Sequence, residues 1–519
     1  MFKNFTITRY ILIFFILFAF PFISSAISVP FNILDYGAIG DGTTLNTKSI
    51  QSAIDACAKS GGGTVYFPAG KYLSGTLFLK SHITLSLDAG AVLMGSKNLG
   101  DYPVTVSKVR SYTDEYTDKS LVYGEGLEHI TISGQGMMDG NGASFKGPYK
   151  VRPFMIRIIN CKNVLIKDVT IINSPMWVQH FLACENVNID GITVNSRVND
   201  NNDGIDIDGC KNVRISNCDI ISGDDAIVLK STLDKPCDNV TITNCVLSSI
   251  CNAFKLGTET NGGFQNITLS NCTIYDTPLA GITLQLVDGG TLNRVLVSNV
   301  TMNNVGTAIF IRLGNRARPY TKKMAKPGMG KMSDIIISNV QAKNVGNIGC
   351  SITGLPDYPA ENITLENIRL TFQGGGNGEL VKREVPEVPD VYPEYTMFGK
   401  LPAYGFYCRH AKNLTFNDVE LDFIEPDGRP AIVFDDITGL DLYKIKARVM
   451  GSEPLIQCKD VKNMFVQSCI APKDIETFLH ISGEKSKHIT LLGNDLSGAK
   501  NAVIKGDKIE VYLDSNRLK

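Results

Sequence analysis

The chain has 519 residues, with 51 Lys and Arg against 52 Asp and Glu and a formal charge of −1 at pH 7. So small a net charge argues against a dedicated nucleic-acid-binding protein, which needs a strong positive field. The length would allow several domains. However, a repeat that runs through most of the sequence favours one long domain, residues 27–519, with no nucleic-acid partner.

The first 26 residues have the order typical of a secretory signal peptide. Lys3 and Arg9 precede an apolar run at residues 11–22, and small residues follow at 24–26. This run is too short to anchor the chain in a bilayer. We therefore predict that residues 1–26 are removed, and that the mature chain is exported to the periplasm or the extracellular space without a membrane span.

Residues 46–63 predict a helix that covers the N-terminal end of the domain. Asn46 or Thr47 can cap it, and Gly61–Gly63 can end it. The three glycines could also cradle a phosphate, but a helix stop before the strand at 64–67 explains them better. The apolar face of this helix consists of Ile50, Ala53, Ile54 and Cys57.

Short apolar runs recur from residue 163 onwards at intervals of about 25 residues. Within one unit Val213 and Ile215 alternate with Arg214 and Ser216, which is the periodicity of a β-strand. Helical patterns are absent between the units, so parallel strands must connect through turns, as in a β-solenoid. The runs follow Asn163, Asn186, Asn212, Asn239, Asn266, Asn293, Asp334, Asn362, Asn413, Gly439, Asn463 and His488.

Two residue types repeat in step with the predicted coils. Asparagines close successive strands and predict a ladder of side chains bonded to the backbone of neighbouring turns. Cysteines follow three of them, and we interpret these as a buried stack of thiols rather than as metal ligands. With 13 cysteines in all, at least one would stay unpaired if the others formed disulfides. The asparagines are Asn217, Asn244, Asn271, Asn299, Asn339 and Asn367, and the cysteines are Cys218, Cys245 and Cys272.

Asp203, Asp224 and Asp225 are the candidate catalytic residues. Hydrolysis of a glycosidic bond needs one carboxylic acid for the leaving oxygen and one carboxylate for the water. Adjacent coils would bring the three together, where mutual repulsion raises at least one pKa. The alternatives are turn-forming aspartates or a calcium site, but turn chemistry explains only one Asp per coil.

The repeat also predicts which residues share the surface around these aspartates. If Asp203, Asp225 and Asn252 occupy the same position in successive coils, the apolar residues of the strands that follow them point inwards. Acidic groups at one end of the outward face then meet basic groups at the other, which suits a sugar acid. The outward columns are Asp206, Val228, Lys255, Thr283 and Phe310, and then Asp208, Lys230, Gly257, Gln285 and Arg312.

Further candidates lie outside these columns. Trp177 could stack on a sugar ring or fill a coil, and His180 is a weaker candidate. Residues 316–331 hold six basic residues and no acid, which fits a solvated loop or a contact with an anionic polymer. Residues 373–405 are rich in Pro and Tyr and could wall one end of the groove, which favours attack at chain ends.

Several motifs resemble glycoside hydrolase family 28, the polygalacturonase family. They include DYGAIGDG at Asp35, DGNG at Asp139, RPFMIRIINCKNV at Arg152 and NSPMWVQH at Asn173. The resemblance covers residues 31 to about 345 and implies an all-β, right-handed parallel β-helix that hydrolyses pectic polysaccharides with inversion. Its catalytic region would lie at about 150–345.

The resemblance also implies roles for the aspartates. NND at 201–203 matches the Asn-Thr-Asp motif of the family, and GDD at 223–225 matches its Asp-Asp motif. Asp225 would be the general acid, with Asp203 and Asp224 holding the water. No metal or cofactor is implied, and we expect a monomer.

Two departures from the family concern the expected ligands of a galacturonate carboxylate. Asn252 stands at the histidine of Gly-His-Gly, and Thr283-Leu284-Gln285 replaces Arg-Ile-Lys. Lys255 or Arg312 could supply the missing charge, and Glu259 adds a carboxylate. The predicted substrate-binding residues are Asn202, Asn252, Lys255, Glu259, Gln285, Arg312 and Trp177.

We therefore expect an exo-acting glycosidase of galacturonan or rhamnogalacturonan type, with a pectic polysaccharide or oligosaccharide as its partner. A β-elimination lyase on the same fold is one alternative, and it would need calcium and a basic residue. A solenoid that binds carbohydrate without catalysis is the other.

Overall fold

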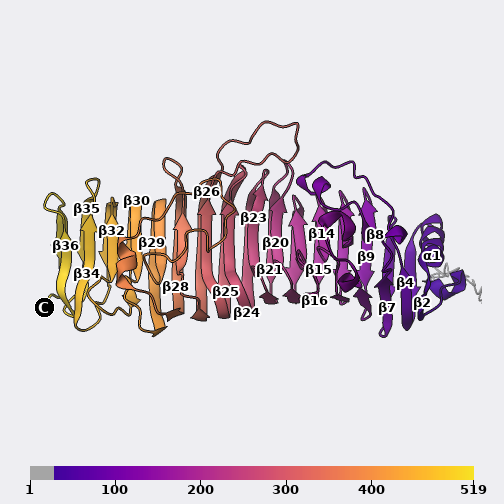
Figure 1. Ribbon diagram of the computed structural model, residues 1–519, viewed down its shortest axis with the longest axis horizontal. Helices are drawn as coiled ribbons and strands as arrows, with labels where there is room; N and C mark the ends of the chain where they lie inside the picture. The colour runs from indigo at the N-terminus through magenta and orange to yellow at the C-terminus, as the bar shows by residue number, and fades with distance from the viewer. Residues whose placement is uncertain (1–28) are drawn as a thin grey trace, which may run out of the picture.

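The computed structural model describes residues 29–519, so the predicted signal peptide at 1–26 lies outside the described residues. The chain forms an elongated stack of coils, with helix α1 (Thr47–Lys59) at the N-terminal end and the C-terminus at the opposite end (Figure 1). The named strands pair in parallel from one coil to the next, as the repeat predicted. Among the described residues, no helix has both the length and the apolarity to cross a bilayer.

Each coil contributes to three columns of strands. The first column carries the candidate site and contains β5 (Leu77–Phe78), β8 (Ser120–Glu125), β11 (Phe154–Ile159), β14 (Gln179–Leu182), β17 (Ile205–Asp208), β20 (Ile227–Ser231), β23 (Phe254–Thr260), β27 (Cys350–Thr353), β32 (Ile456–Lys459), β34 (Ile475–Ser482) and β36 (Ala499–Lys505). The second contains β1 (Phe31–Asn32), β3 (Gly63–Phe67), β6 (Ile83–Leu87), β9 (Glu128–Ser133), β12 (Lys162–Lys167), β15 (Glu185–Asp190), β18 (Lys211–Ser216), β21 (Cys237–Thr243), β33 (Lys462–Gln467), β35 (Lys487–Leu492) and β37 (Val511–Asp514).

The third column contains β2 (Asp41–Leu45), β4 (Gly70–Ser74), β7 (Ala91–Gly95), β10 (Met137–Asp139), β13 (Thr170–Ile172), β16 (Thr193–Ser196), β19 (Asp219–Ser222), β22 (Val246–Ser249) and β31 (Lys446–Ala447). Six longer strands bend through the corners and belong to more than one column: β24 (Phe264–Leu286), β25 (Thr291–Leu313), β26 (Lys331–Val345), β28 (Ala360–Gly374), β29 (Phe406–Glu425) and β30 (Ile432–Tyr443). Short 3-10 helices lie in the connections: η1 (Ile33–Tyr36), η2 (Leu99–Asp101), η3 (Tyr112–Glu115), η4 (Gly142–Ser144), η5 (Tyr149–Val151) and η6 (Gly378–Lys382).

The interior of the coils is apolar, and α1 closes it at the N-terminal end. Ile205 and Ile207 of β17 are fully buried, as are Ile227 and Leu229 of β20. The predicted apolar face of α1 is also fully buried, because the first coil would otherwise expose its core. Asn46 precedes the helix, but its side chain accepts from the Ile39 N–H at 2.7 Å instead of capping the helix.

The asparagine ladder differs in detail from the prediction. Its members bond mainly to each other's side chains rather than to the backbone of neighbouring turns. The Asn339 amide donates to the Asn299 side chain at 2.9 Å, and Asn367 donates to Asn339 at 2.7 Å. A second ladder joins Asn186 to Asn163 at 3.0 Å. Side-chain bonding is possible because these asparagines adopt the left-handed conformation at the same corner of successive coils.

The cysteine stack agrees with the prediction. Cys218, Cys245 and Cys272 are at most 2% exposed and follow each other on successive coils. All 13 cysteines lie within residues 29–519, and each is a free thiol in this structure.

The stacked core predicts a large cost for a cavity in the middle of the solenoid. Ile215 of β18 is fully buried, so Ile215→Ala should lower the free energy of unfolding by about 2–5 kcal/mol. The neighbouring Arg214 is exposed, so Arg214→Ala should change it by no more than about 0.5 kcal/mol. Guanidinium unfolding followed by circular dichroism measures both changes, and equal losses would contradict the assignment of the two faces.

Candidate active site

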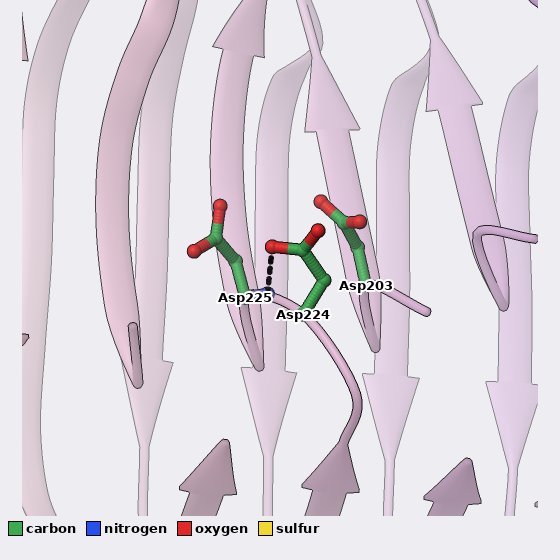
Figure 2. Close-up of side chains that lie close together, drawn as sticks. All are labelled: Asp203, Asp224 and Asp225. Atoms are coloured by element: carbon green, nitrogen blue, oxygen red, sulfur yellow. Dashed lines mark hydrogen bonds between the residues drawn. The ribbon is translucent and has the colours of Figure 1, made fainter. Parts of the chain in front are cut away.

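Asp203, Asp224 and Asp225 lie together at the beginning of two adjacent strands. Ile205 of β17 pairs with Ile227 of β20, which places Asp203 level with Asp225. One oxygen from each of the three carboxylates lies within 4.8 Å of the others. Figure 2 shows Asp224 on the turn between the other two. Asp203 and Asp225 are each 2% exposed, so the structure brings the predicted catalytic residues into one largely buried cluster.

Hydrogen bonds within the turns hold the Asp224 side chain and the loop that precedes Asp203. The Asp225 N–H donates to Asp224 Oδ1 at 2.9 Å (Figure 2), and the Asp224 carbonyl accepts from Ser249 Oγ at 2.6 Å. Asn202 donates through its amide to the carbonyls of Ser174 and Met176 at 2.9 and 3.0 Å. Both amide hydrogens of Asn202 are thereby used within the protein. Asn202 therefore shapes the loop and has no amide hydrogen left for the sugar that it was predicted to bind.

Two buried lysines neutralise part of the negative charge. Lys255 Nζ is 2.9 Å from Asp225 Oδ2, and Lys230 Nζ is 3.5 Å from Asp203 Oδ2 and 3.6 Å from Asp206 Oδ1. Burial alone would lower the pKa of both lysines, but these carboxylates outweigh it and hold each pKa well above its usual range. Both ammonium groups therefore stay charged and partly offset the cost of burying carboxylates.

The lysines do not offset all of the repulsion among the carboxylates, and this repulsion contributes to raised pKa values of two aspartates. Burial, and then the charge of Asp224, raise the pKa of Asp203 well above its ordinary value. Burial, and then the charge of Asp225, raise the pKa of Asp224. A carboxylate with a raised pKa is a stronger base, so both groups suit the activation of water.

Asn252 supports Asp225 from the next coil. Its amide donates to Asp225 Oδ1 at 2.8 Å, and its Oδ1 accepts from the Ala280 N–H at 3.1 Å. The residue at the histidine position of the family therefore orients the predicted acid.

Glu259 reaches the site through an irregularity that the repeat does not predict. Leu229 pairs with Leu256, but Ser231 pairs with Thr260. Lys230 therefore does not lie opposite Gly257 as the repeat predicted. Glu259 then lies 3.8 Å from Lys230 and 2.7 Å from Arg318. Burial raises the pKa of Glu259, but these cations together with Arg316 outweigh it and hold that pKa well below its usual range. Glu259 is thus an ionised partner of the cations and a poor proton donor.

Two other predicted substrate ligands, Arg312 and Gln285, bind groups of the protein itself. Arg312 is fully buried and donates to the carbonyls of Gly354 and Glu387 at 3.0 and 2.6 Å. Gln285 is also fully buried and donates to the Pro393 carbonyl at 2.8 Å. The structure therefore corrects the prediction that Arg312 and Gln285 face the sugar, because their polar groups bind the backbone of neighbouring segments.

Trp177 packs in a small apolar cluster outside the main core, with Phe154 and Met176, rather than presenting a face to a sugar. It is 4% exposed and packs against Phe154 and Tyr116, with ring centroids 5.6 and 5.3 Å away. Lys230 Nζ lies 4.6 Å from the ring centroid and occupies one face of the indole. His180 is also fully buried and contacts Asp208 at 3.2 Å.

The insertion at 373–405 adds two residues that sequence reasoning missed. Glu394 Oε1 lies 3.3 Å from the Asn252 amide and 3.8 Å from Lys255 Nζ. The Lys255 ammonium also donates to the Tyr392 hydroxyl at 3.3 Å. The insertion does not follow the coil repeat, so its residues cannot be assigned to a column from the sequence. The abundance of Tyr and acidic residues in this segment was the available signal.

The basic segment at 316–331 has arginines that bind other parts of the protein and lysines that face solvent. Arg316 donates to Asp288 at 2.9 Å, and Arg318 contacts Glu259 and donates to the Tyr112 hydroxyl at 2.9 Å. Its lysines are exposed to solvent. The loop rises above the first column of strands (Figure 1), and its two arginines fasten it beside the site.

The three aspartates could in principle coordinate a cation. Calcium binds carboxylate oxygens at about 2.3–2.6 Å, so one ion could lie among oxygens this close together. However, the Lys255 ammonium already occupies Asp225, and Lys230 faces Asp203. Two buried positive charges this close oppose a divalent cation, so the donor set fits calcium poorly.

Comparisons with known proteins agree with this architecture. The family model for glycosyl hydrolases family 28 matches residues 57–386. A probable polygalacturonase of Vitis vinifera is 38% identical over 222 residues, 39% of this chain and 45% of that protein. An exo-poly-alpha-D-galacturonosidase of Dickeya chrysanthemi is 31% identical over 258 residues, 39% of this chain and 42% of that protein. The chain therefore spans less than half the length of either relative.

A solved structure is similar over most of the chain. The family 28 exopolygalacturonase of Yersinia enterocolitica gives a TM-score of 0.63 at 22% identity, and the match covers 81% of this chain and 79% of that chain. This similarity confirms the predicted right-handed parallel β-helix.

The ion pairs at the aspartates predict that calcium does not bind there. A ligand that binds only the folded state raises its stability. Millimolar calcium or EDTA should therefore leave the midpoint of thermal unfolding unchanged, as differential scanning fluorimetry would measure. A rise with calcium that Asp224→Asn abolishes would contradict this expectation and favour a lyase-type site.

Proposed function

Because this chain belongs to glycosyl hydrolases family 28, we propose that it is an exported, exo-acting glycosidase that hydrolyses pectic polysaccharides or oligosaccharides with inversion. The observation that carries the proposal is the buried cluster of Asp203, Asp224 and Asp225. A hydrolase needs such carboxylates on one surface. The names of the relatives, a probable polygalacturonase and an exo-poly-alpha-D-galacturonosidase, support a pectic substrate.

In the proposed reaction, Asp225 protonates the leaving oxygen while Asp203 and Asp224 take a proton from the attacking water. Lys255 at 2.9 Å and the Asn252 amide at 2.8 Å stabilise the carboxylate that Asp225 becomes. The raised pKa values of Asp203 and Asp224 strengthen them as bases. One proton leaves the acid and another reaches the base in each turnover, so exchange with solvent restores the starting state.

The stereochemical outcome is part of the proposal and rests on the family resemblance. Oxygens of the three carboxylates lie within 4.8 Å of each other, whereas the two carboxyl groups of inverting glycosidases are usually about 6.5–9.5 Å apart. Nuclear magnetic resonance of the first product distinguishes the outcomes, because inversion gives the opposite anomer and retention the same one.

The exo mode is supported by the insertion at 373–405. Tyr392 and Glu394 contact Lys255, and the Pro393 carbonyl accepts from Gln285, on the coils that follow Asp225. The chain of a bound polysaccharide would meet this segment beyond the aspartates. A closed end of this kind favours attack on the terminal sugar.

The proposed roles predict that the aspartates are needed for turnover. Asp225→Asn keeps the size of the side chain but removes the acid, so kcat should fall about 10²- to 10⁴-fold. Asp203→Asn and Asp224→Asn should also lose turnover, because the water is then held by one carboxylate instead of two. Asn252→Ala should cost less, because the amide at this position transfers no proton.

The exposed Asp219 provides a matched control, and Asp219→Asn should retain full turnover. Circular dichroism and thermal unfolding establish that each variant folds. A folded Asp225→Asn protein with nearly normal turnover on its best substrate would refute the assignment of the acid.

The absent Arg-Ile-Lys motif predicts a particular substrate preference. Unbranched polygalacturonan should be a poorer substrate than branched or rhamnose-containing pectic oligosaccharides. Reducing-end assays with chromatography should show single terminal sugars released without new absorption at ultraviolet wavelengths. Unsaturated products would indicate a lyase instead, and no release from any pectic fraction would favour a carbohydrate-binding solenoid.

A further inference from the structure

Glu394 places a carboxylate where the proposed substrate would bind. It comes from the insertion and lies beside Asp225, with its Oε1 within 3.3 Å of the Asn252 amide and 3.8 Å of Lys255 Nζ. Its other oxygen, Oε2, is buried and has no hydrogen-bond partner. A buried carboxylate oxygen without a donor is costly, so a hydroxyl group that reached this atom would offset that cost.

The cations around the aspartates are already paired with carboxylates. Lys255 faces Asp225 and Glu394, and Lys230 faces Asp203, Asp206 and Glu259. Arg318 of the basic loop contacts Glu259 and Asp288. These three cations are therefore not available to a carboxylate from outside, whereas Arg152, beside Asn201, bonds to the Asp200 carbonyl and the Asn201 side-chain oxygen.

A uronate carboxylate would meet more carboxyl groups than cations at this position. The carboxylates of Asp203, Asp206, Asp224, Asp225, Glu259 and Glu394 surround the two lysines. Like charges repel strongly in such a buried site, whereas the hydroxyl groups of a neutral sugar can donate to carboxylate oxygens. Thr283 and Gln285 offer no positive charge in compensation.

Building on the proposed function, we propose that the terminal sugar held between the aspartates and Glu394 is neutral. Glu394 is a specificity residue, which accepts a hydrogen bond from a sugar hydroxyl through Oε2 and repels the carboxylate of a uronic acid. The pectic backbone beyond that sugar can still be acidic, because the exposed lysines of the 316–331 loop lie outside the cluster.

The experiment compares three oligosaccharides of equal length that differ only in the sugar at the non-reducing end. One ends in galacturonate, the second ends in its carboxyl-reduced counterpart galactose, and the third ends in rhamnose, a neutral deoxyhexose. The galacturonate and galactose pair isolates the charge. We expect the galacturonate-ended oligosaccharide to have the lowest kcat/KM of the three, at least 10-fold below the better neutral one.

Variants of the insertion assign the effect to Glu394. Glu394→Gln should lower KM for the galacturonate-ended substrate and narrow the preference at least 5-fold. The exposed Asp390 lies in the same insertion, so Asp390→Asn is a matched control and should leave the preference unchanged. Best activity on the galacturonate-ended substrate, or an unchanged preference in a folded Glu394→Gln protein, would overturn the inference while leaving the hydrolase proposal intact.

A binding measurement separates this inference from the proposed function. If no oligosaccharide is cleaved, the hydrolase proposal fails, and calorimetric titration with galacturonic acid, galactose and rhamnose at pH 7 still tests the site. Tighter binding of a neutral sugar, weakened by Glu394→Ala, would support the inference. Tighter binding of galacturonic acid would overturn it.

Discussion

The backbone hydrogen bonds between parallel coils are the constraint on which the rest of this structure depends. Each strand must pair with the strand at the same position one coil later, so equivalent residues stack in columns. The spacing between coils is only about 4.8 Å, which is also the distance between neighbouring side chains in a column. Acidic residues at equivalent positions, such as Asp203 and Asp225, are therefore forced together whether or not their charges repel.

The protein accommodates this repulsion with lysines from the strands of the next coils. Lys230 and Lys255 lie on the strands that follow the aspartates, and burial strengthens their attraction to the carboxylates. This compensation has a functional consequence. A lysine that neutralises a catalytic carboxylate is not available to bind a carboxylate of the substrate, so the same ion pairs that stabilise the site restrict the sugars it can accept.

The sequence allowed the repeating part of the structure to be predicted in detail. The period of the repeat predicts that Asp203, Asp225 and Asn252 occupy the same position in successive coils, and the strand pairings confirm this prediction. Glu259 was placed less well because two additional residues in β23 shift the register after Leu256. Arg312 and Gln285 were assigned to the correct columns, but the segment that buries them is an insertion. Glu394 could not be assigned at all, since its position depends on long-range contacts rather than on the period.

Those contacts explain how a segment without strands is held in place. Between β28 and β29 this segment forms no strand ladder with a neighbouring coil, so its buried carbonyls need other donors. Arg312, Arg409 and Arg429 supply them: Arg409 donates to the Val385 and Pro386 carbonyls at 2.6 and 3.0 Å, and Arg429 donates to that of Leu401 at 3.1 Å. The insertion is thereby fixed to the coils through its backbone, and buried side chains such as Phe398 and Leu401 pack against the coils as well. In the proposed function, a change at Glu394 would alter the choice of sugar, whereas the aspartates that carry out the chemistry belong to the coils.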